Sequence, residues 1–355
     1  MTGLFPPQER DLNLPTEGHL STRAAERIVI EAATVPFDTA AMKLNHDWST
    51  VLDGKQIQRW SERIGARAVA RREAALAALE DQDVRPPCKA NEHALLVIGM
   101  DGGRVQKRRK NADGTRWSED KVLTVTSFIP GDGTDDGPGP QKLLSSYLAT
   151  MQGVEKFGRL ARLEAERRGV RDAGQVVLLG DGATWIDGVA QKHFPRAARI
   201  VDWYHAAEHL HATARAAHPD DESRSSECAE GLKSMLWEGK FDALMSELDA
   251  MSARAGEPPK DASPTDPREV LRTTPGYFRR RRGQMDYPAY RKRGWPIGSG
   301  ITESGVKLFN KRVKGTEQFW STEGAESILE LRSQWLNDPS DLHHRLWPAP
   351  TRSAA

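Results

Sequence analysis

The stretch Gln175-Val-Val-Leu-Leu-Gly-Asp181-Gly182 decides the fold. Its apolar run is typical of a buried β-strand that ends at Gly180-Asp181. A second run, His93–Met100 (HALLVIGM), has the same character and is expected to end at Asp101, which Gly102 follows. Side chains at the carboxyl ends of strands in an open sheet emerge into a crevice where ligands bind, so the two aspartates are candidate site residues. The alternative is that each Asp-Gly pair forms a plain turn.

The elements around these two runs follow an α/β order. Further strands are expected at Val122–Ile129, Ser145–Thr150 and Ala198–Val201. A turn at Asn111–Gly114 favours a hairpin between the first two strands, and helical spacing occurs at Val154–Arg168 and Trp185–His193. Three hairpin-type strands, a helix, and then strand–helix–strand is the order of an RNase H-like core. We expect a mixed sheet flanked by helices, built from residues 90–204 and 291–337.

The rest of the chain has helical patterns. After an irregular lead-in, the small N-terminal helical region (1–85) is expected to form helices at Thr22–Ala33, Asp38–Asn45, Gly54–Ile64 and 65–82. The first three are compatible with a helix-turn-helix, although an ordinary helical bundle suits the spacing better. Residues 205–290 are interpreted as an all-helical insertion. Helices are expected again at Ile301–Val313 and Glu323–Asn337, and residues 338–355 are expected to form a loosely ordered tail.

A third acidic residue, Glu303, lies in the first turn of the helix that follows Ile297–Gly300. The intervals are 181 − 101 = 80 and 303 − 181 = 122, and the second leaves room for the insertion. Three carboxylates converging from two strands and a helix can hold two Mg²⁺ ions, for which Mn²⁺ can substitute. Such ions activate an attacking oxygen and stabilise the leaving oxygen at a phosphodiester.

Three segments carry a family resemblance: Leu178–Ile186 (LLGDGATWI), Ile200–Leu210 (IVDWYHAAEHL) and Pro296–Glu303 (PIGSGITE), the last followed by Val313-Lys-Gly315 and Trp320-Ser321. Together they resemble the ISKra branch of bacterial DDE transposases, which is related to mutator-like elements. The resemblance covers most of residues 90–335 and is weaker over 10–80, where the family has a helix-turn-helix-like region. The chain is shorter than a full-length member, which is compatible with loss of N-terminal DNA-binding sequence.

The resemblance implies that Asp101, Asp181 and Glu303 are the catalytic, metal-binding acids. It implies strand cleavage and strand transfer at insertion-sequence ends, with the terminal inverted repeats and target DNA as partners and a homo-oligomer on DNA. Two other interpretations remain open. One is an RNase H-like nuclease or resolvase without strand transfer, and the other is a decayed, non-catalytic DNA-binding derivative.

The segment Asp202-Trp-Tyr-His205 resembles a signature that such transposases carry after their second acid. In one interpretation these residues support the site from behind, with His205 bonded to a metal-bound carboxylate or a phosphate. In the other, Asp202 caps the following helix and His205 packs inside it. His209 and His211 add a zinc alternative, which the lack of a nearby cysteine disfavours.

Basic residues are concentrated around Glu303. From Tyr277 to Trp320 there are 11 Lys or Arg and 3 Asp or Glu, a balance of 11 − 3 = +8. A surface that binds DNA phosphates is the favoured interpretation, and a solvated charged face is the alternative. The candidate DNA-binding residues are Lys307, Lys311, Arg312, Lys314, Arg291 and Arg293. Trp295 and Phe319 could stack on a base, whereas Trp320 is expected in the core.

Composition restricts the protein class without naming a partner. The 355-residue chain has a net charge of +1, 28% charged residues and two distant cysteines, Cys88 and Cys228. This argues against a disulfide framework and a zinc ribbon. The first 15 residues lack the apolar core of a secretory signal, and no run is long enough to cross a membrane. We expect a cytoplasmic, nucleoid-associated protein.

Overall fold

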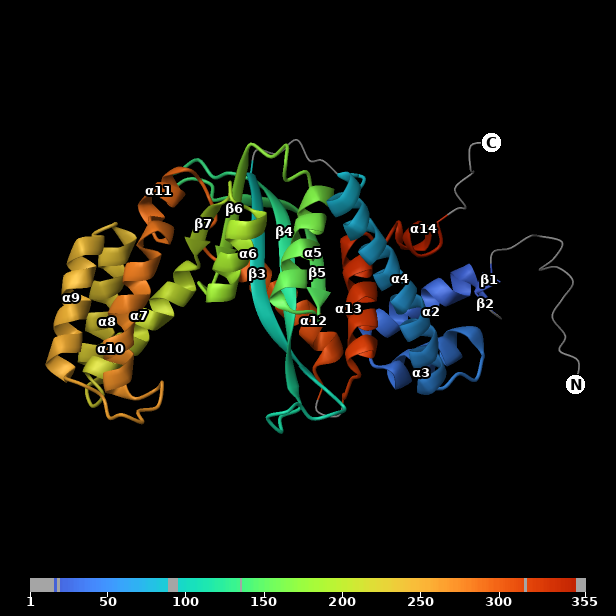
Figure 1. Cartoon of the computed structure of the whole chain (residues 1–355), viewed down its shortest axis with the longest axis horizontal. Coiled ribbons are helices and arrows are strands. Elements are labelled where there is room, and N and C mark those ends of the chain that lie inside the picture. Colours follow the sequence, from blue (N-terminus) through green and yellow to red (C-terminus); the bar gives the residue numbers. More distant parts are fainter. Residues whose placement is uncertain (1–15, 18–19, 89–94, 135, 316–317, 349–355) are drawn as a thin grey trace, which may run out of the picture.

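The computed structural model describes residues 16–17, 20–88, 95–134, 136–315 and 318–348. These residues form an α/β fold with a mixed, open, five-stranded sheet flanked by helices (Figure 1). The strands lie in the order β5-β4-β3-β6-β7, where β3–β4–β5 are antiparallel and β6 and β7 run parallel to β3. Their bounds are β3 Leu95–Gln106, β4 Trp117–Ile129, β5 Gln141–Thr150, β6 Gln175–Gly180 and β7 Ala198–Val201. A hairpin of two short strands, β1 Thr16–Glu17 and β2 Leu20–Ser21, precedes the first helix.

The expectation that the first core strand ends at Asp101 is wrong. Strand β3 continues to Gln106 and pairs with β4 from Leu95↔Phe128 to Gln106↔Trp117. Its parallel pairing with β6 stops earlier, at Gly99↔Leu179. The apolar run ends where β3 extends beyond its pairing with β6, and β3 itself continues past that point. His93 and Ala94, assigned to this strand from the sequence, lie outside the described residues.

Helices bury both faces of the sheet. On one face α5 (Val154–Arg167) and α6 (Thr184–His193) pack on Ile98, Leu123 and Leu148. On the other, α12 (Gly300–Val313) and α13 (Thr322–Asn337) pack on Val122 and Ala149. The alternation of β-strand side chains explains this, since Leu123 and Val122 are adjacent and point to opposite faces.

The N-terminal helices share the core of the sheet domain. They are α2 Thr22–Thr34, α3 Phe37–Trp48 and α4 Gly54–Gln82. Residues 54–82 form one continuous helix where two were predicted, and a capping box between Asp53 and Gln56 starts it. Ala25, Val29 and Ile64 join the same hydrophobic cluster as Ile328 of α13. Residues 22–82 are therefore part of the body of the protein.

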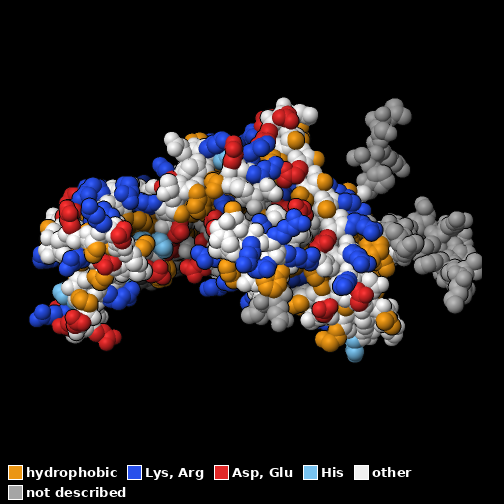
Figure 2. Space-filling view, turned by 60° about the horizontal axis from the view of Figure 1, so that its bottom comes forward, with side chains coloured by type: hydrophobic (Ala, Val, Ile, Leu, Met, Phe, Trp, Pro, Cys, Tyr) orange, Lys and Arg blue, Asp and Glu red, His pale blue; other side chains and the backbone are white. Residues whose placement is uncertain are grey.

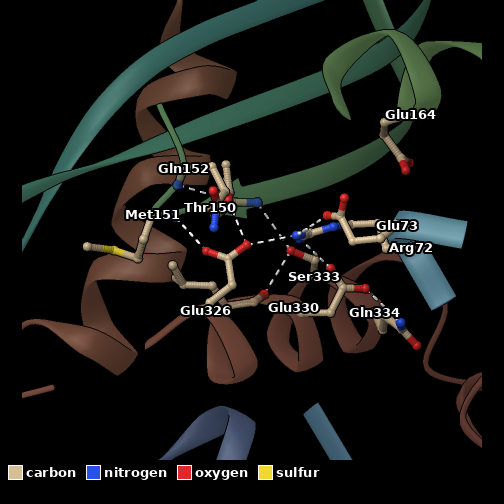
Figure 3. Close-up of polar contacts among 12 residues, drawn as sticks. Arg72, Glu73, Thr150, Met151, Gln152, Glu164, Glu326, Glu330, Ser333 and Gln334 are labelled. Atoms are coloured by element: carbon tan, nitrogen blue, oxygen red, sulfur yellow. Dashed lines mark hydrogen bonds and ion pairs between the residues drawn. The ribbon is translucent and has the colours of Figure 1, made fainter. Parts of the chain in front are cut away.

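A buried ion-pair network joins α4 to α13 (Figure 3). Arg72 is 3% exposed and donates to Glu326 at 2.8 Å and to Glu330 at 2.9 Å. Glu326 also accepts from the Thr150 hydroxyl and the Met151 backbone N–H, both at 2.7 Å. The end of β5 is thereby tied to the same pair of helices.

Residues 203–292 form an arm of helices at one edge of the sheet, beside β7 (Figure 1). The helical arm contains α7 Trp203–Ala217, α8 Glu222–Trp237, α9 Phe241–Ala255, α10 Pro267–Arg281, the 3₁₀ turn Arg282–Gln284 and α11 Tyr287–Lys292. The segment has the helical character expected from its periodicity. Leu210, Leu244 and Phe278 of the arm belong to one cluster with Val201 and Leu179, so the arm packs on the sheet edge.

The C-terminal segment contains a helix where a loosely ordered tail was expected. Helix α14 (Leu342–Leu346) buries Leu342 and Leu346 against the α2–α13 core, which corrects that expectation for these residues. Residues 349–355 lie outside the described part of the chain. Within the described residues, no helix has the length and apolar character that spanning a membrane requires.

Candidate active site

Asp101 lies within β3, two residues beyond the last pair between β3 and β6. Its Oδ1 accepts a hydrogen bond of 2.6 Å from the backbone N–H of Gly102. Burial raises the pKa of Asp101, and the negative charges of Asp181 and Glu303 raise it further. The carboxyl group is therefore partly buried and within electrostatic range of two other acids.

Asp181 follows the last residue of β6, as the sequence predicts. Its Oδ1 accepts from the Ala183 N–H at 2.8 Å, which closes a tight turn. Gly182, in the middle of this turn, has a φ of +82°, a conformation that glycine adopts without steric cost. The turn fixes the carboxylate just beyond the carboxyl end of β6.

Glu303 lies in the first turn of α12, and a close approach between this helix and the sheet brings it near the aspartates. A Cβ on Gly99 would lie 1.8 Å from Thr302 Oγ1, so only glycine permits this approach. Thr302 and Thr124 are hydrogen-bonded at 3.2 Å across the contact. The Glu303 carboxylate itself is exposed, with Lys307 Nζ 3.7 Å away.

The three acids line one pocket of about 260 Å³, the acid pocket. Its lining is Met100, Asp101, Gly180, Asp181, Asp202, Tyr204, His205, Glu208, Ser299, Thr302 and Glu303. Figure 2 shows acidic and histidine side chains gathered in the recess between the helical arm and the body. Two elements of the sheet and one helix thus place their carboxylates at a common opening.

The donor chemistry of the acid pocket fits a hard divalent cation. Asp101, Asp181 and Glu303 offer only oxygen, the ligand that Mg²⁺ and Mn²⁺ prefer. Among the described residues, no group of three His, Cys, Asp or Glu side chains is arranged to hold a single ion. Mg²⁺ commonly takes only one or two carboxylates and fills its shell with water and substrate phosphate. The set therefore fits ions that share these carboxylates with water and phosphate.

Asp202 connects the helical arm to the Glu303 helix. Its Oδ1 caps α7 by accepting from the His205 N–H at 2.7 Å, and its Oδ2 accepts from the Ser299 N–H. The side chain is only 1% exposed. Asp202 is thus both a helix cap and a clamp on the segment that leads into Glu303. Its contact with that segment is made through the Ser299 backbone.

His205 is half-exposed and lines the acid pocket, with Nδ1 3.6 Å from Glu208. Its ring meets that of His209 edge-on at 5.0 Å, and His209 stacks on Tyr277 at 4.1 Å. Burial, followed by the positive charges of His205 and Arg281, lowers the pKa of His209 to about 4. The three rings thus form a row from His205 in the acid pocket to Tyr277 on α10.

The predicted DNA-binding residues fall into two groups. Lys307 and Lys311 are exposed on α12, and Lys314 is exposed as the C-cap residue that follows it. Arg312 is 1% exposed, donates to the Ala32 carbonyl and packs against the rings of Phe37 and Trp320, so it cannot contact DNA. Its assignment as a DNA-binding residue is therefore wrong. The helical repeat explains the error, because it places Arg312, like Val313, on the buried face of α12.

Arg291 and Arg293 do not lie with the acids. Arg291 packs over Trp237 at 3.9 Å, and Arg293 over Trp295 at 4.8 Å. Arg293 lines a pocket with Ala198, the first residue of β7, whereas Asp181 follows Gly180, at the opposite end of the pairing between β6 and β7. Arg291 and Arg293 are thus close to Glu303 in the sequence but not in the structure.

Of the three aromatic residues singled out, Trp320 is 4% exposed in the core, which confirms the expectation, and Trp295 is 8% exposed. Phe319 is 40% exposed and lies beside a basic hairpin that the sequence interpretation passed over. This β3–β4 tip carries Lys107, Arg108, Arg109, Lys110 and Arg116. The run was visible, but it was interpreted only as a turn because Asn111–Gly114 dominates the local pattern.

No protein-family model matches the chain, and no match is found among curated proteins.

Proposed function

We propose that this chain is a DNA transposase of the DDE type, with Asp101, Asp181 and Glu303 as its catalytic acids. One observation carries the proposal: three acids that are 80 and 122 positions apart line a single pocket. Carboxylates gathered around one opening beside β3 and β6 are suited to metal-dependent chemistry on a phosphodiester.

The sheet supports an RNase H-like assignment within this proposal. Three antiparallel strands come first, and β6 and β7 then add in parallel on the other side of β3. Asp101 lies on the central strand, and Asp181 follows the strand next to it. The helical arm enters between β7 and α12, where an insertion leaves this arrangement of strands undisturbed.

Mg²⁺ or Mn²⁺ bound by the three acids would activate the attacking oxygen and neutralise charge on the leaving oxygen. The chain itself supplies positioning. The turn after β6 fixes Asp181, the Gly99–Thr302 contact fixes α12, and Asp202 holds the backbone before Glu303. In the proposed reaction water first cuts the phosphodiester and releases a 3′-hydroxyl. That hydroxyl then attacks a phosphodiester of the target DNA and displaces a 3′-hydroxyl of the target strand, so no covalent protein intermediate is needed.

The proposed DNA path runs along α12 toward the β3–β4 hairpin. Lys307 and Lys311 are exposed at a spacing of four, which places them on one face of α12, and Lys314 follows as the exposed C-cap residue. Lys314 lies 5.8 Å from the centre of the exposed Trp117 ring, at the base of the basic hairpin. These cations suit the phosphate backbone, which gives affinity without sequence information.

The decisive test uses purified protein, Mg²⁺, and a duplex carrying the terminal inverted repeats that flank the gene, with a target plasmid. We expect cuts at the repeat ends and products in which those ends are joined to the plasmid, formed by a homo-oligomer on DNA. Cleavage without joining would favour the nuclease or resolvase alternative. DNA binding without cleavage would favour the decayed derivative.

A further inference from the structure

Three arginines at the end of α10 and Arg282 of the following 3₁₀ turn are consecutive in sequence and face two different ways. Arg279 pairs with Asp249 of α9 at 2.9 Å, and Arg282 pairs with Asp242 of α9 at 2.7 Å. These two charges are neutralised within the helical arm. Arg280 and Arg281 lie on the other side of the helix.

Arg280 and Arg281 line a second pocket, of about 650 Å³, which we call the α10 pocket. Its full lining is Asp181, Gly182, Ala183, Thr184, Asp187, His205, Tyr277, Arg280 and Arg281. Asp181 and His205 also line the acid pocket, so the two pockets adjoin. A strand of substrate that leaves the acids at Asp181 enters the α10 pocket next.

Arg281 is a buried cation without an acidic partner. Its side chain is 7% exposed, its guanidinium lies 4.7 Å from the centre of the Tyr277 ring, and one N–H donates to the Gly182 carbonyl. Its Nε is buried without a hydrogen-bond partner, and within the described residues no carboxylate forms an ion pair with it. A buried, uncompensated charge is costly, so this position favours a bound anion.

The N-terminus of α6 opens into the same pocket. Its N-cap is Ala183, which has no side chain able to accept from the first-turn N–H groups. Such groups and the helix dipole favour phosphate. The nearest acid of that turn, Asp187, is engaged by Gln284 at 3.0 Å and Arg199 at 3.4 Å. Its carboxylate is therefore already engaged by two residues outside the pocket lining.

We infer that the α10 pocket binds a backbone phosphate of the DNA strand. This phosphate is next to the one at which the strand is cut. Arg280 and the α6 N-terminus contact this phosphate, and Arg281 adds charge while it holds the Gly182 carbonyl. The inference rests on the proposed function, and it makes the helical arm part of the substrate-binding surface. No hydrogen bond or ion pair of Arg280 occurs among the described residues, so its charge is available to a ligand.

The test compares Arg280→Ala with Arg279→Ala, a neighbour of the same type whose charge is already paired with Asp249. Binding of full-length protein to a short repeat-end duplex is measured by fluorescence anisotropy without divalent metal, over a range of salt. We expect Arg280→Ala to lower the slope of log K against log salt by roughly 0.9 and to weaken binding about fivefold to tenfold near 0.1 M salt. Arg279→Ala should behave as wild type, and Arg280→Lys should restore the slope.

Equal slopes for wild type and Arg280→Ala would overturn the phosphate site, whether or not the protein cuts DNA. Arg280-dependent binding by a protein that never cuts would retain the site and overturn the proposed enzyme. Normal cutting and joining with no effect of the Arg280→Ala change would overturn the phosphate site and retain the proposed enzyme. The two proposals therefore fail on different measurements.

Discussion

The hydroxyl of Tyr277, on α10, donates a hydrogen bond of 3.2 Å to the backbone carbonyl of Asp181. The next carbonyl, of Gly182, accepts from Arg281 of the same helix. The helical arm thus grips the loop that carries one of the three acids. A residue of the arm that is 96 positions from Asp181 thus determines how the loop after β6 is held.

This relationship predicts that Tyr277→Phe slows cleavage while DNA binding is kept. The variant loses one partly buried hydrogen bond, which we expect to lower the unfolding free energy by about 1 kcal/mol. The loop is then less well fixed, so kcat should fall more than affinity. Tyr290→Phe is a matched control, since it removes a hydroxyl contact to Gly283 inside the arm. If both variants cut at the wild-type rate, the grip on Asp181 has no catalytic role.

Asp181→Asn should abolish cleavage and preserve DNA binding. The change keeps the shape but removes one of three negative charges that share the acid pocket. Affinity for duplex should stay the same or rise slightly, because a repulsive charge is lost. A gel-shift assay and a cleavage assay on the same preparation measure both effects. Asp242→Asn, exposed on α9, is the control. Cleavage by Asp181→Asn at the wild-type rate would remove this residue from the mechanism.

The triple variant Lys307→Ala, Lys311→Ala, Lys314→Ala should bind every DNA sequence more weakly and show a flatter salt dependence. Each lost phosphate contact lowers the slope of log K against log salt by roughly 0.9. A control triple variant at Lys55, Lys192 and Lys233, on α4, α6 and α8, should keep the wild-type slope. An unchanged slope for the α12 variant would mean that these lysines are solvated surface. A loss confined to one sequence would mean that they read bases.

The sequence was most informative where side-chain pattern and backbone structure depend on the same residues. The run from Gln175 to Leu179 could be assigned to a strand because the residues from Val177 onward are buried on both faces of the sheet, which requires consecutive apolar side chains. The helical arm followed from periodicity alone. Asp101 was placed at a strand end because the apolar run stops there, yet hydrogen bonds to β4 continue the strand with polar and glycine residues.

Other features depend on contacts that no local pattern contains. Arg312 has the composition of a surface residue, but α2 ends against it and offers the Ala32 carbonyl in place of water. Whether the acids share a pocket depends on the close approach of Gly99 and Thr302, which are about two hundred positions apart in sequence. Arg280 differs from Arg279 only in which neighbour it faces, and that depends on how α9 packs.

The buried network around Arg72 predicts a large stability effect far from the acids. Arg72→Ala leaves Glu326 and Glu330 buried without their cation, which should cost roughly 3–5 kcal/mol in unfolding free energy. Replacing Arg72 by Met together with Glu326→Gln and Glu330→Gln should recover part of that loss. Arg59→Ala, exposed on the same helix, should change stability by less than about 0.5 kcal/mol. Chemical denaturation of the three variants measures these differences.

Asp120, on β4, predicts a pH dependence of stability. The side chain is fully buried, and neither carboxylate oxygen has a hydrogen-bond partner. Burial, with a further contribution from the negative charge of Glu119, raises the pKa of Asp120 to about 6 from an ordinary value of 3.8. The folded protein therefore holds this proton more tightly than the unfolded chain does. The contribution of the group is most favourable below about pH 4 and is lost as the pH rises through 6.

Asp120→Asn should consequently be more stable than wild type at pH 7, by about 3 kcal/mol at most, and no more stable at pH 4. The amide keeps the volume and removes the buried charge, while it leaves the same lack of partners in both proteins at low pH. Asp113→Asn, in the turn that joins β3 to β4, is the contrasting variant. Hydrogen bonds from Thr115 lower the pKa of Asp113, so its replacement should give no gain at pH 7. Urea unfolding of the three proteins at pH 4, 5.5 and 7 measures the effect. A stability difference between Asp120→Asn and wild type that stays constant across these pH values would show that the carboxyl does not titrate in this range.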